Sequence, residues 1–243
     1  MKNPVRTQPA PWDFGRLTSL LRRERAAFDP LSAPKCRANL GLWVMTICLG
    51  AGCFGAAMGS WRSPLQALYT AIKLPLVILL TTLGNSLLNA MLAPLLGLNL
   101  SYRQTSAVIL MTFAITAVML GALSPVAWFV VWNTPPLTAA MRLSSPEYGV
   151  MQLTLAGFIA LAGVVGNVHL LPFLSEWAGN VATARKVLFA WLAGNLFLGS
   201  QIAWVLRPFI WDPARPVEFI GREYLHGSFF ETVFEAARRL IFS

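Results

Sequence analysis

The sequence predicts an all-α polytopic membrane protein, a bundle of five transmembrane helices with an amphipathic helix at each end. Of the 243 residues, 56% are hydrophobic and only 12% are charged, whereas soluble domains carry about 25% charged residues. The few charges are unevenly placed, because no Asp or Glu occurs between Asp29 and Glu147. Five charge-free runs remain, each long enough to cross a hydrocarbon core of about 30 Å. This pattern excludes a soluble domain, a disordered chain and a disulfide scaffold.

The five apolar runs predict five helices, because in lipid every backbone polar group needs a partner within the span. These runs are continuously apolar, unlike the alternating strands of a membrane barrel. The third run exceeds the length of one helix, and Asn133-Thr134-Pro135-Pro136 predicts its end, since proline cannot continue a helix. The predicted spans are residues 39–60, 74–97, 106–131, 149–172 and 187–206.

The basic residues predict the orientation. Residues 1–37 hold eight Lys and Arg against three Asp and Glu, which places this segment in the cytoplasm. Five spans then put the C-terminal tail on the opposite side. A polar stretch of this length before the first apolar run argues against a signal peptide. The net charge of +9 is concentrated beside a membrane helix, so we expect anionic lipid headgroups, and not nucleic acid, as its partner.

Both flanks of the predicted transmembrane domain, residues 38–207, contain an amphipathic segment. In the basic segment 1–37, residues 12–28 predict an interfacial helix that anchors the chain or docks a cytoplasmic partner. In the tail 208–243, Ser228 to Glu231 match a capping box. The helix that follows has an apolar face, a candidate partner surface, formed by Phe230, Phe234, Ala237 and Ile241. This apolar face could contact the outer leaflet of the membrane, the transmembrane bundle or a neighbouring subunit.

Small residues at helical spacing predict close helix packing in two spans. The run from Gly50 to Gly55 matches G-x-G-x-x-G, but it lies within a lipid-length apolar run, so it is not a dinucleotide site. The candidate packing residues are Gly52, Gly55 and Gly59 in the first span and Ala162 and Gly166 in the fourth. Ala156 and Ala160 form a similar row in the fourth span.

A polar stripe on the second span is the strongest candidate for a functional surface. It consists of Thr82, Asn85, Ser86 and Asn89, which follow helical spacing. Amides facing lipid are costly, so these side chains are expected to point into the bundle. There they either form hydrogen bonds between helices or line a pathway for a neutral solute.

No constellation for catalysis is visible. The central parts of the predicted spans contain no Asp, Glu, Lys or Arg, and the three cysteines lack C-x-x-C spacing. His169 is an isolated histidine near the end of the fourth predicted span, where a hydrogen-bonded interface residue is expected more often than a proton relay. We therefore predict a protein without enzymatic activity, metal or cofactor.

The end of the fifth span carries a recognisable sequence. The stretch from Gly199 to Phe209, followed by Pro216-Val217-Glu218-Phe219 and by Gly227 to Glu231, resembles the C-terminal signature of an uncharacterised family of bacterial polytopic inner-membrane proteins. The number of spans and Ser101-Tyr102-Arg103-Gln104 are distantly similar to the five-helix Yip family. These resemblances imply location in a bacterial inner membrane and carry over no functional residues.

The residues of this signature are suited to anchoring at the membrane surface. Trp204 and Trp211 bracket the exit from the membrane, Arg207 can reach phosphates, and Glu218 is a candidate partner of Arg207. Two functions follow. The first is a scaffold or accessory subunit of a larger membrane complex, bound to other membrane subunits or to copies of itself. The alternative is a channel or small-solute transporter subunit with a neutral polar pathway along the second span.

Overall fold

The protein is a bundle of long helices. The computed structural model describes residues 36–98, 100–135, 146–207 and 217–220, and this part of the chain contains helices and no strand. Its helices are α2 (Cys36–Gly59), α3 (Pro64–Leu95), α4 (Tyr102–Trp132), α5 (Pro146–Val168), α6 (Leu171–Ala178) and α7 (Val181–Leu206). Five segments are long and apolar enough to cross a membrane, with α5 and α6 counted as one. The prediction of an all-α protein with five such helices is confirmed.

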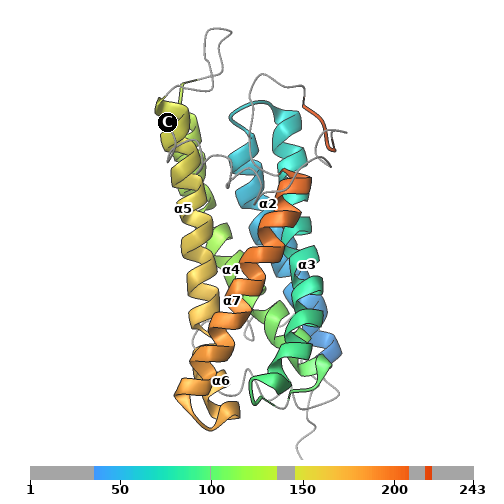
Figure 1. Ribbon diagram of the computed structural model, residues 1–243. Helices are drawn as coiled ribbons and strands as arrows, with labels where there is room; N and C mark the ends of the chain where they lie inside the picture. The colour runs from blue at the N-terminus through green and yellow to red at the C-terminus, as the bar shows by residue number, and fades with distance from the viewer. Residues whose placement is uncertain (1–35, 99, 136–145, 208–216, 221–243) are drawn as a thin grey trace, which may run out of the picture.

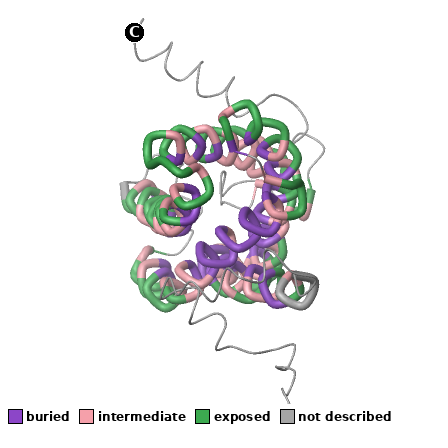
Figure 2. Tube along the Cα trace, turned by 90° about the horizontal axis from the view of Figure 1, so that it is seen from below, coloured by how far each residue is buried: buried purple, intermediate pink, exposed green. Residues whose placement is uncertain are grey.

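Successive long helices run in opposite directions (Figure 1). Helix α2 packs against both α3 and α4, α4 also contacts α5, and α7 lies against α3. Viewed along the helices, buried residues gather towards the middle of the bundle and exposed residues on its outer faces (Figure 2). The exposed outer side chains include many large apolar ones, as expected where the solvent is lipid.

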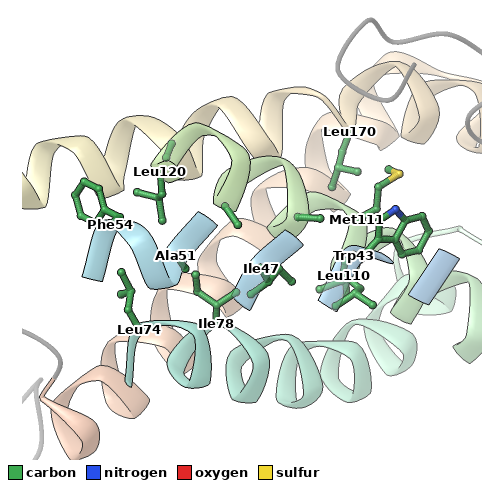
Figure 3. Packing of buried hydrophobic residues seen from close by; sticks show 14 of the residues in the cluster. Trp43, Ile47, Ala51, Phe54, Leu74, Ile78, Leu110, Met111, Leu120 and Leu170 are labelled. Atoms are coloured by element: carbon green, nitrogen blue, oxygen red, sulfur yellow. The ribbon is translucent and has the colours of Figure 1, made fainter. Parts of the chain in front are cut away.

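The core centres on one face of α2. Ile47 and Ala51 lie beside Ile78 of α3, and Phe54 lies on the opposite side, next to Leu120 of α4 (Figure 3). Phe54 also meets Phe158 of α5 edge to face, with 6.5 Å between ring centroids. Because lipid is as apolar as these side chains, shape complementarity and dispersion stabilise this core more than the removal of water does.

Helix α3 begins ten residues before the predicted span. Ser63 accepts a hydrogen bond from the backbone N–H of Gln66, and Pro64 occupies the first turn, an arrangement that favours helix initiation. The predicted start at residue 74 is wrong, because Lys73 does not mark the boundary of the span. Lys73 instead lies inside the helix with only 1% of its surface exposed.

The other boundaries also follow local capping chemistry. Ser101 and Gln104 form a capping box at the start of α4. Asn180 caps α7, which begins at Val181, six residues before the predicted span. The fourth predicted span, residues 149–172, is interrupted after Val168, and the short helix α6 then continues to Ala178. The predicted amphipathic helices at both chain ends lie outside the described residues.

Candidate functional site: an amide cluster between α3, α5 and α7

The polar stripe of α3 points into the bundle. Thr82, Asn85, Ser86 and Asn89 are all buried. The Thr82 hydroxyl donates to the carbonyl oxygen of Ile78 at 2.8 Å, and the Ser86 hydroxyl donates to that of Thr82 at 2.7 Å. These two hydroxyls are therefore satisfied within α3. The two asparagines are the members of the stripe with amide groups free to reach neighbouring helices.

A chain of amides links three helices. The Asn85 Nδ2 donates to the Oδ1 of Asn195 on α7, and the Asn195 Nδ2 is 3.5 Å from the Oδ1 of Asn167 on α5. The Asn167 Nδ2 donates to the carbonyl oxygen of Gly163 at 2.8 Å. We call Asn85, Asn89, Asn167 and Asn195 the amide cluster. Asn167 and Asn195 were not among the predicted site residues, although each is an amide within an apolar run.

Glycine on α7 allows the cluster to form. A Cβ atom added to Gly194 would lie 3.2 Å from the Asn85 Oδ1 and 3.9 Å from the Asn89 Oδ1. Two further small residues lie at the same interface, because Gly84 faces Leu198 and Gly199 faces Thr81. The α7 backbone thus passes directly over the two asparagines of α3.

Several buried polar atoms of this interface lack a hydrogen-bond partner among the described residues. They are the Asn85 Oδ1, both amide atoms of Asn89 and the Thr81 Oγ1; the Nε1 of Trp191, a buried residue of α7, also lacks a partner there. Native proteins pair more than nine in ten of their buried polar groups, and an unpaired one calls for an explanation. The cluster is consequently more than a set of completed hydrogen bonds between helices.

A second polar group on α3 faces a different helix. The Gln66 Nε2 donates to the Thr70 Oγ1 at 3.2 Å, and both residues are buried. A Cβ atom on Gly59 of α2 would meet the Gln66 carbonyl oxygen at 2.6 Å, so this group lies at the α2–α3 contact. Buried apolar residues, among them Leu74 and Ile78, separate it along α3 from the amide cluster.

The segment 217–220 covers Lys73. The Lys73 Nζ donates to the Glu218 carbonyl oxygen at 3.3 Å and lies 5.4 Å from the centroid of the Phe219 ring. The same ring meets Tyr69 edge to face at 5.4 Å. A carbonyl dipole and an aromatic face both stabilise a cation that burial has separated from water. The chain after α7 therefore returns to α3 and shields this lysine.

Phe219→Ala is expected to make Lys73 reactive. Removing the ring opens the cover over the ammonium group, so an amine-reactive ester added to the protein in lipid should label Lys73 several-fold more than in the native protein. Mass spectrometry of the peptides measures the labelling, with exposed Lys186 as an internal reference. Ile220→Ala, an adjacent exposed residue, is the matched control and should leave labelling low. Equal labelling in both variants would contradict the shielding role.

The predicted packing residues divide between two helix contacts. On α2, a Cβ on Gly55 would lie 2.5 Å from the Thr70 carbonyl oxygen, and Gly59 is equally close to α3, whereas Gly52 has ordinary spacing to it. On α5, Ala162 is fully buried, and a Cβ on Gly166 would lie 2.2 Å from the Thr116 Oγ1 of α4. The tightest of the glycine contacts involves Gly50, which begins the same glycine run: a Cβ on Gly50 would lie 2.1 Å from the Ala117 carbonyl oxygen of α4.

The predicted anchor is partly described. The Arg207 guanidinium lies 4.6 Å from the Trp204 ring centroid, and Arg207 ends α7 with a positive φ of 40°. Glu218 contributes its backbone carbonyl to Lys73, and its pairing with Arg207 stays a prediction. Trp211 and the C-terminal face Phe230, Phe234, Ala237 and Ile241 lie outside the described residues.

Comparisons with known proteins do not supply a function. No family model, curated protein or solved structure matches this chain. The functional argument therefore depends on the geometry of the amide cluster, on the Lys73 cover and on the outer faces of the helices.

Proposed function

We propose that the protein is a non-enzymatic accessory or scaffold subunit of a larger membrane complex, in which α5 receives a transmembrane helix of another polypeptide. The supporting observation is an exposed patch of small residues on α5, formed by Ala156, Gly157 and Ala160. A Cβ atom on Gly157 would meet nothing within 4 Å. We call these three residues the α5 patch.

Small residues elsewhere in the chain indicate what such a patch is suited to. Gly50, Gly55 and Gly166 each allow a neighbouring helix to approach so closely that a methyl group would overlap it. The α5 patch offers the same small surface, flanked by the exposed side chains of Leu153, Leu161 and Val164. Large side chains around a small-residue patch form the groove into which a second helix packs in lipid.

Site-specific crosslinking tests this proposal. A photoreactive amino acid at Gly157, activated in native membranes, is expected to give a discrete protein adduct larger than the 26.6 kDa chain. The same group at Phe189, an exposed residue of α7, is expected to react mainly with lipid. The adduct's mass then identifies another subunit or a second copy. Equal absence of adduct at both positions would count against a docked helix.

A matched pair of variants separates docking from folding. Gly157→Leu fills the patch and is expected to abolish a larger assembly seen by native mass spectrometry from lipid discs, without lowering the bundle's melting temperature, because the added side chain enters open space. Gly149→Leu makes the same change elsewhere on α5, also in open space, and should leave the assembly intact. An assembly unaffected by Gly157→Leu would contradict docking at the patch.

The resemblance noted at the C-terminal end supports a bacterial inner membrane as the location. The basic segment 1–37 supports a cytoplasmic N-terminus held against anionic headgroups, with the C-terminus on the other side. Labelling of single cysteines at each end from one side of intact cells tests this topology. Labelling of both ends from the same side would contradict it.

A second candidate function is a channel or small-solute transporter subunit, supported by the buried amides of α3. Uptake of neutral solutes into proteoliposomes is expected to fall to the background of empty vesicles in the double variant Asn85→Leu, Asn89→Leu. Circular dichroism of the reconstituted variant controls for folding. The apolar stretch between Lys73 and Thr81 argues against a continuously polar path, and a native protein that transports no neutral solute would remove this candidate.

A further inference from the structure

We propose that α3 and α7 enclose a binding site for a small, uncharged, hydrogen-bonding ligand, with the Asn89 amide as its main contact. The proposal goes beyond the accessory-subunit role and does not depend on it. It also names the ligand class that the second candidate function would require.

Buried polar atoms without a hydrogen-bond partner are the first evidence for a ligand. Asn85 and Asn89 are each 0% exposed and Trp191 is 1% exposed. The Asn89 Nδ2 and Oδ1, the Asn85 Oδ1 and the Trp191 Nε1 have no partner in the described part of the chain. In lipid no bulk water can satisfy them. A ligand that both donates and accepts hydrogen bonds would remove the desolvation penalty of these groups.

The register of the two helices brings these atoms to one place. Along the antiparallel contact, Gly199 faces Thr81, Leu198 faces Gly84, and Gly194 faces Asn85 and Asn89. Continuing this register by one turn puts Trp191 level with Asn89. Trp191 shares a helix face with buried Ala184 and Val187, which is the face turned towards the bundle. The indole N–H and the Asn89 amide can therefore reach the same ligand.

Size and charge limit what can bind. The α7 backbone at Gly194 passes so close to Asn85 that an added Cβ would lie 3.2 Å from its Oδ1, which favours a ligand of few atoms. The sequence has no charged residue between Lys73 and Leu95 of α3 or between Lys186 and Leu206 of α7. A charged ligand would be desolvated there without an opposite charge, at high cost. A neutral ligand avoids the cost of burying an unpaired charge.

Two sources share this chemistry: ordered water and a small neutral organic solute such as a primary amide. Acetamide serves as the neutral organic probe, and acetate, which has nearly the same shape but carries a charge, serves as its control. The protein is labelled with 5-fluorotryptophan, reconstituted in lipid, and its Trp191 ¹⁹F resonance is assigned by Trp191→Phe. Acetamide is expected to shift this resonance saturably, and acetate is expected not to shift it.

Variants tie the response to the proposed contacts. Asn89→Leu removes both unpaired atoms and is expected to abolish the acetamide shift. Gly194→Ala places a methyl group beside Asn85 and is expected to weaken binding without removing any polar group. Thr82→Val is the matched control, because its hydroxyl already donates to the Ile78 carbonyl oxygen, and it should bind as the native protein does. A shift that survives Asn89→Leu, or is lost equally in Thr82→Val, would overturn the assignment.

Water as the ligand is tested separately. If acetamide gives no saturable shift, an experimental structure at a resolution that shows waters should contain density within hydrogen-bond distance of the Asn89 Nδ2 or Oδ1. Absence of both the shift and the density would overturn the proposal. The ¹⁹F shift and the electron density measure ligand binding, and neither measures solute transport or assembly. Binding without solute uptake would therefore contradict the transporter function while supporting the proposed binding site. The crosslinking result at Gly157 is independent of both.

Discussion

Gly50→Ala is expected to destabilise the bundle by about 3 kcal/mol, the upper part of the range for overpacked cores. The added Cβ would lie 2.1 Å from the Ala117 carbonyl oxygen and 2.7 Å from the carbonyl carbon. These are backbone atoms of α4, so no side chain can rotate to make room and the two helices must separate. Separation also disturbs the packing of Ile47 and Phe54, both fully buried on α2.

Gly41→Ala on the same helix is the matched control. A Cβ at Gly41 would meet nothing within 4 Å, so the change should stabilise the protein by up to about 1 kcal/mol through helix propensity. Unfolding of both variants in mixed micelles, followed by circular dichroism, measures the two effects. Equal midpoints for the variants would show that α2 and α4 do not make the contact on which this prediction depends.

The number and type of the long helices could be predicted because length and apolar composition alone decide them. A run of about 20 apolar residues has few alternatives to a membrane helix. The start of α3 differs from the prediction because a lysine does not mark the edge of this span. Ser63-Pro64 followed by Gln66 is the capping signal that starts the helix, and it places Lys73 inside α3.

The amide cluster could be predicted only on α3. Helical spacing puts Asn85 and Asn89 on one face, but their partners depend on which helices become neighbours, and no local pattern specifies that. Asn167 and Asn195 are separated by 28 residues and meet only in the folded bundle. Both share the feature that identifies the stripe on α3, an amide within an apolar run.

The small-residue rows show the same limit. Ala162 and Gly166 of α5 face α4, while Ala156 and Ala160 are exposed on the outer surface of the same helix. The spacing of small residues predicts close packing for both rows. It does not indicate which row packs against another helix of the same chain. The structure makes that distinction, and it is the reason that the α5 patch is the more informative row for function.

Asn195→Leu is expected to destabilise the protein by about 3 kcal/mol. Asn195 accepts from the Asn85 Nδ2 and donates towards the Asn167 Oδ1, so its replacement leaves two buried amide atoms without partners. Each unsatisfied group costs about 1–3 kcal/mol, more than the hydrogen bonds themselves contribute in lipid, about 0.6 kcal/mol on average. Ser200→Ala, whose hydroxyl donates to the Phe197 carbonyl oxygen of its own helix, should change stability by less than about 0.5 kcal/mol.

The double variant Asn85→Leu, Asn195→Leu decides whether this loss comes from the orphaned amide or from the altered shape of α7. With Asn85 also replaced, its Nδ2 is no longer present to be left unpaired, so the double variant should lose less than the sum of the single losses, by about 1 kcal/mol or more. Unfolding midpoints of the four proteins in lipid-containing micelles give this coupling directly. Additive losses would mean that α3 and α7 are held by packing around Gly194 alone, and the amide cluster would then contribute little to joining the helices.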